Sequence, residues 1–150
     1  MAHEGMVYAL EEIHRLLSPG GRLIDIHPFA EAPLAEIHQG GKIIFAEPIP
    51  VQYQEDIRQA DAALAQVIQR GLFVVERSAA FDIRIYGSSV TELNDYLAER
   101  DAYDDSPPDE AMMAQQEELA AHVEGLMLVA GEGAEVAYHD RARITRLRPG

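Results

Sequence analysis

The most constraining feature of this chain is the turn Ser18-Pro19-Gly20-Gly21, together with the two segments that it joins. Apolar residues recur at helical spacing over residues 6–17, and the apolar segment 22–28 is typical of a strand covered by helices on one or both faces. Proline and glycine end the helix and reverse the chain. The sequence therefore predicts a helix that returns tightly into a buried strand. The apolar helical positions are Val7, Leu10, Ile13 and Leu17, widened by Ala9 and Leu16.

Further helices and strands are predicted from the same kinds of pattern. In chain order they are a hairpin over residues 35–45 that turns at Gly40-Gly41, a helix over 54–70, a strand over 72–86, a short helix opened by a Ser89–Glu92 capping box, a helix over 111–129 and a strand over 136–147. Phe81, Ile83 and Ile85 alternate with polar residues, which predicts a half-buried sheet face. The acidic, proline-bearing stretch 101–110 predicts a flexible exposed loop.

These elements predict an α+β fold, a partial α/β arrangement in which a mixed, largely antiparallel sheet is flanked by helices. A chain of 150 residues is long enough for one hydrophobic core, so we expect a single domain over residues 1–150.

Composition excludes several classes of function. The 26 acidic and 12 basic residues give a net charge of -14, which disfavours binding to nucleic acid or to an anionic membrane surface. The absence of cysteine excludes disulfides, thiolate metal sites and a cysteine nucleophile. No apolar run is long enough to span a membrane, and the N-terminal residues lack the features of a secretory leader, so we expect a cytoplasmic protein.

The segment 9–26 resembles one part of the class I S-adenosylmethionine-dependent methyltransferases. In that family a helix of the pattern L-x-E-x-x-R-x-L-x-P-G-G precedes the fifth strand of a Rossmann-like sheet. The matching residues are Leu10, Glu12, Arg15, Leu17, Pro19, Gly20 and Gly21. The resemblance implies that segment 22–28 corresponds to that fifth strand, and that the two later long strands correspond to the antiparallel sixth and seventh strands.

The chain departs from that family in the part that holds the cofactor. The family binds S-adenosylmethionine mainly through its first four strands and a glycine-rich loop, and this chain contains no G-x-G-x-G. The resemblance therefore implies the C-terminal half of a methyltransferase. We expect no cofactor-binding residues in it, no catalysis by the isolated chain, and S-adenosylmethionine only where a partner supplies the site.

The four strands that the resemblance implies are missing would affect how the chain associates with other chains. The strand 22–28 would keep an uncovered edge and its helices would keep bare apolar faces, which folded proteins avoid by pairing, covering or dimerising. We therefore expect a homodimer or a complex with a partner protein.

Asp25 and His27 are the candidate substrate-binding residues. They alternate on one face of the first strand near its C-terminal end, where open α/β sheets place ligand chemistry. The alternative is that they are strand-end residues hydrogen-bonded to neighbouring loops. The pair Glu11 and His14, like the single histidines His122 and His139, lacks further convergent ligands, so we expect no metal site.

Arg141, Arg143, Arg146 and Arg148 cluster in the last strand, and their predicted role is in salt bridges, with an anionic ligand as the alternative.

Three functions are consistent with these patterns. The first is a non-catalytic methyltransferase-like fragment that self-associates or binds a partner protein. The second is one half of a split S-adenosylmethionine-dependent methyltransferase that another chain completes, which a neighbouring reading frame with the glycine-rich loop would favour. The third is an unrelated α+β domain that binds a small ligand, which would be favoured if the first strand formed the outer edge of an antiparallel sheet.

Overall fold

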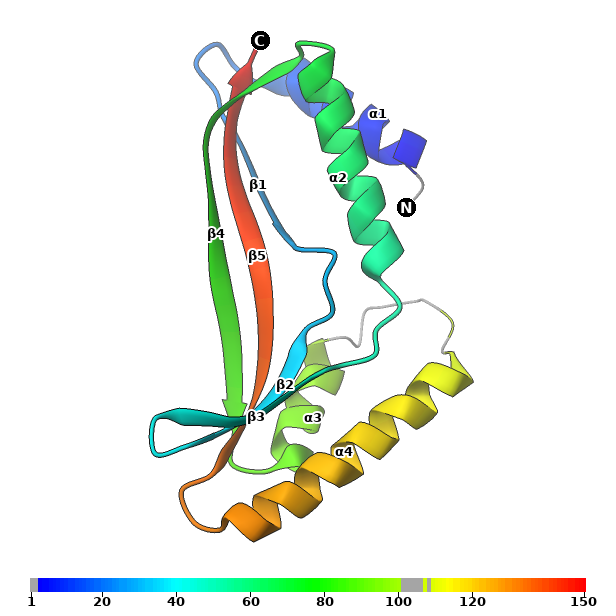
Figure 1. The fold of residues 1–150 in the computed structure, drawn as a ribbon. Helices are drawn as coiled ribbons and strands as arrows, with labels where there is room; N and C mark the ends of the chain where they lie inside the picture. The colour runs from blue at the N-terminus through cyan, green and yellow to red at the C-terminus, as the bar shows by residue number, and fades with distance from the viewer. Residues whose placement is uncertain (1–2, 101–106, 108) are drawn as a thin grey trace. The chain divides into compact units, whose positions relative to one another are not determined.

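The computed structural model describes residues 3–100, 107 and 109–150 (Figure 1). In chain order the elements are α1 (His3–Leu16), β1 (Leu23–Pro28), β2 (Leu34–Gln39), β3 (Lys42–Pro48), α2 (Gln54–Gln69), β4 (Phe73–Gly87), α3 (Val90–Arg100), α4 (Glu110–Ala130) and β5 (Glu135–Pro149). The α+β class and the largely antiparallel sheet are confirmed. Most of the predicted loop 101–110 lies outside the described residues, and its last residues, Asp109 and Glu110, cap and begin α4.

Strand β5 organises the sheet. It pairs antiparallel with β1, from Leu23↔Leu147 to Pro28↔Ala142. Towards its beginning it pairs antiparallel with β2, which in turn pairs with β3. Strand β4 also pairs with β5. Over the described residues the strand order is β1-β5-β2-β3, with β4 as a further neighbour of β5.

The described chain divides into two compact units, and β4 and β5 contribute residues to both. Unit 1 comprises the residues up to Glu31 together with Tyr53–Asp82 and Arg141–Gly150. Unit 2 comprises Ala32–Gln52 and Ile83–Asp140.

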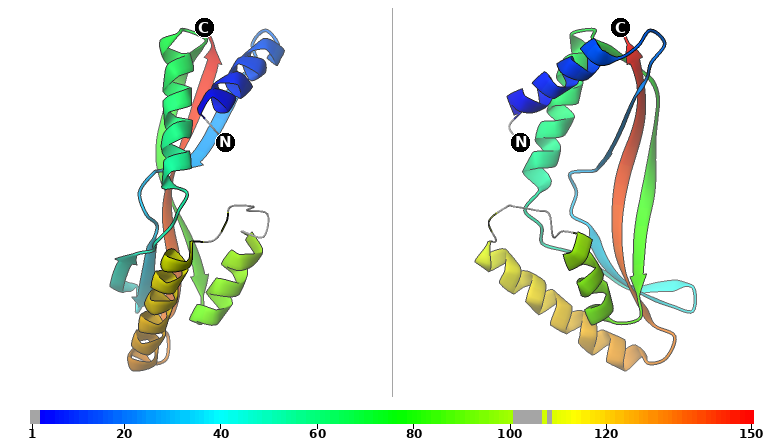
Figure 2. Two further views of the ribbon diagram at one scale, coloured as in Figure 1. Left: turned by 90° about the vertical axis from the view of Figure 1, so that its right-hand side faces the viewer. Right: turned by 180° about the vertical axis from the view of Figure 1, so that it is seen from behind.

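In unit 1, α1 and α2 pack against each other on one side of the strands β1, β5 and β4 (Figure 2). The buried core combines the apolar stripes of both helices with the start of β4 and the end of β5. Its buried members are Val7, Ala63, Val67, Phe73 and Leu147. Because both helices lie on the same side, the opposite face of these strands has no helix of unit 1 upon it among the described residues.

The turn between α1 and β1 forms as the sequence predicts. Gly20 has a φ of 80°, which an L side chain rarely adopts, and Gly21 donates its N–H to the carbonyl of Ser18 at 2.8 Å. A Cβ on Gly21 would lie 2.9 Å from that same carbonyl oxygen. Both glycines are therefore required for the tight return into β1.

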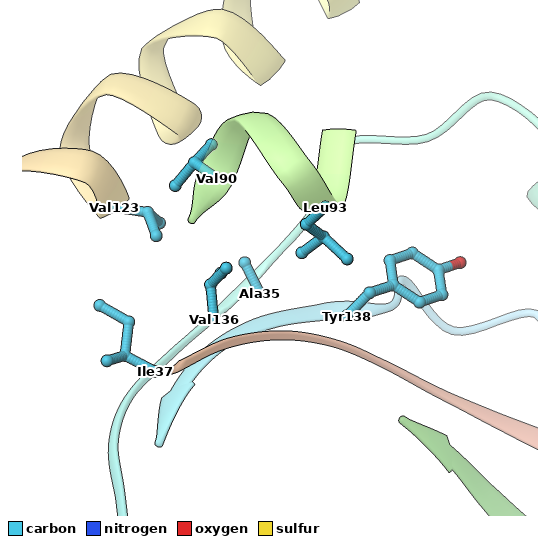
Figure 3. Packing of buried hydrophobic residues seen from close by; sticks show 7 residues of the cluster. All are labelled: Ala35, Ile37, Val90, Leu93, Val123, Val136 and Tyr138. Carbon is cyan, nitrogen blue, oxygen red and sulfur yellow. The ribbon is translucent and has the colours of Figure 1, made fainter. Parts of the chain in front are cut away.

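In unit 2, helices α3 and α4 cover one face of the β2–β5 pair (Figure 3). Gly40 and Gly41 have φ values of 59° and 76°, as a primed hairpin turn between β2 and β3 requires. The core is built from alternate residues of β2 and β5 and from the inner sides of the helices. Its buried members are Ala35, Ile37, Val90, Leu93, Val123, Val136 and Tyr138.

Helices cover only one face of β1, one of the two arrangements predicted for it, because Ile24 and Ile26 are 50% and 59% exposed. Two predictions of burial are wrong. Leu16 lies on the exposed side of α1. On β4, Phe81 and Ile83 are both 38% exposed. Alternation indicates which residues share a face, but it does not specify whether another layer covers that face.

Candidate functional site

The structure brings the two predicted site residues, Asp25 and His27, into contact. Both alternate with Ile24 and Ile26, so they lie on the same face of β1 as Leu23, which packs against the core of unit 1. Nδ1 of His27 lies 2.5 Å from Oδ2 of Asp25. Their contact with a substrate stays a prediction.

A third residue, Asp61 on α2, completes this group. Its carboxylate Oδ1 contacts Nε2 of His27, so the imidazole bridges a strand and a helix. We call Asp25, His27 and Asp61 the His27 cluster. Sequence reasoning missed Asp61, although a signal was present: it follows Ile57 by four residues and precedes Leu64 by three, which places an acid in the inward apolar stripe of the helix.

The His27 cluster holds its imidazole in the protonated state. The hydrogen bond to Asp25 raises the pKa of His27, burial lowers it, and the hydrogen bond to Asp61 raises it again, to about 9. At neutral pH both ring nitrogens therefore donate N–H to a carboxylate. A protonated imidazole cannot accept a proton, so this arrangement is suited to a structural tie or to charge recognition rather than to general-base catalysis.

The C-terminal arginines of unit 1 are partly engaged within the chain. Nε of Arg146 lies 3.5 Å from Oε1 of Glu76, and Nε of Arg141 lies 3.9 Å from Oδ1 of Asp82. The guanidinium groups of Arg141 and Arg143 also lie over the ring of Phe29, 5.0 and 4.7 Å from its centroid. The predicted salt-bridge role is confirmed for Arg141 and Arg146.

A second charged group lies in unit 2 around Glu36, whose side chain is only 3% exposed. Oε1 of Glu36 accepts hydrogen bonds from Nε2 of His38 at 2.8 Å and from Nε of Arg84 at 3.1 Å. Oε2 accepts from Nδ1 of His139 at 2.8 Å. We call these four residues the Glu36 cluster.

Burial raises the pKa of Glu36, but the hydrogen bonds from His38, His139 and Arg84 outweigh that effect, and the pKa is lowered overall. Sequence reasoning missed this cluster. Its only local signal is the spacing of Glu36 and His38, which places both side chains on one face of β2.

Unit 1 exposes an apolar sheet face. Ile26 and Ile144 are cross-strand partners in the β1–β5 pair, and Ile24 lies two residues away on the same face. All three are exposed. We call them the isoleucine face. At its border Glu76 contacts both Arg22 and Arg146, so an apolar centre with a charged rim faces outward, as interaction surfaces commonly do.

Strand β4 exposes both of its faces and one edge. Every residue from Val74 to Arg84 is exposed. Since β1 occupies one side of β5 in unit 1, β4 lies on the other side, and its far edge has no strand neighbour among the described residues (Figures 1 and 2). Backbone N–H and C=O groups along that edge are available for pairing.

Among the described residues, no glycine-rich loop of the kind that holds S-adenosylmethionine in that methyltransferase family leads from a strand into a helix. Gly20 and Gly131 follow helices, and Gly40 lies in a hairpin. Gly87 does lead from β4 to α3, but a Cβ there would lie 3.1 Å from Cβ of Leu93, so this glycine serves helix–strand packing.

No group of three or more histidine, aspartate or glutamate side chains is arranged to hold a metal ion within the described ranges. None of the helices that the structure describes is both long and apolar enough to cross a membrane. A scan against models of protein families, a search of curated proteins and a search of solved structures each found no match to this chain.

Proposed function

We propose that this chain is a self-associating module that works as a homodimer, rather than an enzyme in its own right. The observation that carries the proposal is the edge of β4 that has no strand neighbour in the described part of the chain, in a strand that is exposed from Val74 to Arg84. Long exposed edge strands with apolar side chains associate with other strands unless they are covered. The isoleucine face adds exposed apolar surface on the same sheet.

Charge favours a second copy of the chain as the occupant of this edge. The whole chain carries a net charge of -14, so most of its surface repels another copy. Strand β4 is different, because Glu76 and Asp82 are balanced there by Arg77 and Arg84. Two copies can therefore approach each other along β4 with less electrostatic repulsion than along the more acidic parts of the surface.

Descent from a methyltransferase is part of the same proposal and is supported by local geometry. The Gly20-Gly21 turn connects α1 to β1 as the resemblance implies, and the two long strands β4 and β5 pair with each other. One observation favours the alternative, an unrelated α+β domain that binds a small ligand, because β1 is at an end of the strand order and its neighbour is antiparallel. The proposed self-association depends on β4, so it holds whether or not the chain descends from a methyltransferase.

The mass of the protein in solution tests the proposal. Light scattering behind a sizing column should give twice the monomer mass of 16.6 kDa. Calorimetric titration with S-adenosylmethionine in the same buffer should give no heat of binding. A monomer at all accessible concentrations would overturn self-association, and micromolar binding of S-adenosylmethionine would overturn the non-catalytic assignment.

The second candidate is half of a split methyltransferase. It is favoured by the edge of β1 that has no strand neighbour within the described ranges, and by exposed apolar side chains on α1 and β1, which the resemblance places beside the missing half. These side chains are Tyr8, Leu16, Ile24 and Ile26. A chain encoded nearby that carries the glycine-rich loop should then convert a monomeric form into a heterodimer. Only that heterodimer should bind S-adenosylmethionine, and failure of the mixture to bind it would eliminate this candidate.

A further inference from the structure

We propose that two copies of the chain join through β4 in antiparallel pairing, with Ala80 facing its own counterpart, so that two sheets become one continuous sheet. This inference rests on the proposed self-association and specifies its surface and register.

Strand β4 is the best suited of the outer strands for such pairing. It has 15 residues, against 6 in β1 and 7 in β3. Strands β1 and β3 each end in a proline, Pro28 and Pro48, which lacks the N–H that a ladder needs. Strand β4 contains no proline, and its single glycine, Gly87, is its last residue. It therefore offers the longest uninterrupted row of backbone donors and acceptors.

Symmetry determines the direction of the pairing. A homodimer closes most simply around a two-fold axis, where the same surface of each copy meets the other. Two identical strands related by such an axis run antiparallel, and one residue lies opposite its own counterpart. The register is therefore fixed by naming that central residue.

Side-chain chemistry favours Ala80 as the centre. That register sets Ser78 opposite Asp82, Ala79 opposite Phe81 and Glu76 opposite Arg84 of the second copy. A hydroxyl thus meets a carboxylate, a small residue meets a ring, and no like charges lie directly opposite each other.

Two other registers bring like charges together. Centring on Ala79 sets Glu76 opposite Asp82, and centring on Asp82 sets that carboxylate against its own copy. Like charges directly opposite each other destabilise a sheet.

A single introduced cysteine tests the register, since the chain has none of its own. Directly opposed residues in an antiparallel pair have Cα atoms about 4.5–5.5 Å apart, within the range of a disulfide. We expect Ala80→Cys to give a covalent dimer in most chains under mild oxidation. The matched control is Ala62→Cys, an exposed alanine on α2, which should stay uncrosslinked.

A mixture of two other variants tests the same register if Ala80→Cys folds poorly. Ser78→Cys and Asp82→Cys chains should crosslink to each other when mixed, and neither should crosslink alone. Separately, Ala80→Lys should raise the dimer dissociation constant by about tenfold or more while leaving the circular dichroism spectrum unchanged.

The outcomes separate this inference from the function on which it rests. If the wild type is dimeric but the cysteines at positions 78, 80 and 82 crosslink no better than Ala62→Cys, the dimer forms through another surface or another register of β4, and the proposed register is wrong. If the wild type is monomeric, self-association itself fails. Selective crosslinking at position 80 in a dimeric wild type supports both.

Discussion

The imidazole of His27 connects two carboxylates that belong to different elements, Asp25 on β1 and Asp61 on α2. Its pKa is raised from 6.5 to about 9, so the folded state binds a proton that the unfolded state releases between these values. The stabilisation is complete below about pH 6.5 and is lost as the pH rises through about 9. Because Asp61 is half exposed, solvent weakens this interaction, and we expect the free energy of unfolding to fall by about 1–2 kcal/mol over this pH range.

Denaturant unfolding at a series of pH values between 6 and 10 measures this effect. The substitution His27→Gln should lower the free energy of unfolding at pH 6.5 and remove most of its pH dependence over that range. His122, an exposed histidine on α4, provides the control, because His122→Gln should retain the wild-type slope. Equal slopes in wild type and His27→Gln would show that the His27 cluster does not contribute to stability.

The buried carboxylate of Glu36 has the opposite pH behaviour, because its pKa is lowered on folding. Its contribution is present above about pH 4.5 and is lost as the pH falls through the lowered value. At pH 7 we expect Glu36→Gln to cost about 2–4 kcal/mol, since it leaves His38, Arg84 and His139 without their charged acceptor. Chemical denaturation measures this loss in the free energy of unfolding. The control is the exposed Glu47, because Glu47→Gln should change the free energy of unfolding by less than about 0.5 kcal/mol.

At the scale of residues, the sequence reveals local neighbours better than distant ones. Asp25 and His27 could be placed together because a strand repeats every two residues. Asp61 lies 34 residues beyond His27, and its contact depends on how α2 packs on β1. The Glu36 cluster draws on three strands, and no local pattern connects Arg84 or His139 to Glu36.

Helix α4 begins at a defined cap. The carboxylate of Asp109 accepts hydrogen bonds from the N–H groups of Ala111 at 3.0 Å and Met112 at 3.2 Å. These donors have no partner inside the helix, so Asp109→Ala should lower the free energy of unfolding by about 1 kcal/mol. Thermal unfolding measures the change. Asp109→Asn, which keeps an acceptor, should recover most of it, and equal losses in both variants would contradict a capping role.

At the scale of elements, the predicted helices and strands all form, because each has local determinants. Helix α2 ends before Gly71, whose φ is 80°, and α3 begins where the Ser89 hydroxyl accepts the N–H of Glu92. The covering of β4 could not be predicted in this way. The alternation of Phe81 and Ile83 indicates one shared face, but whether that face is covered depends on helices elsewhere in the sequence.

Each chain carries a net charge of -14, so a dimer brings two strongly acidic molecules together. Raising the salt concentration from about 10 to about 100 mM shortens the screening length from about 30 Å to about 10 Å. We therefore expect the dimer dissociation constant to fall by a few fold over this range, because repulsion between the two acidic bodies weakens. Sedimentation at several salt concentrations measures it. A dimer that weakens with salt would instead show that ion pairs dominate the interface.

Strand β5 has a consequence for how the chain is made. It is the partner of β1, β2 and β4, yet it comes after all three in the sequence. At a synthesis rate of about 5–20 residues per second, β4 waits on the ribosome for about 2–10 seconds before β5 is translated. During that interval the apolar strand has no partner in its own chain and is open to premature contacts with neighbouring nascent chains. The yield of folded protein should therefore depend on chaperones that hold the growing chain until its last strand arrives.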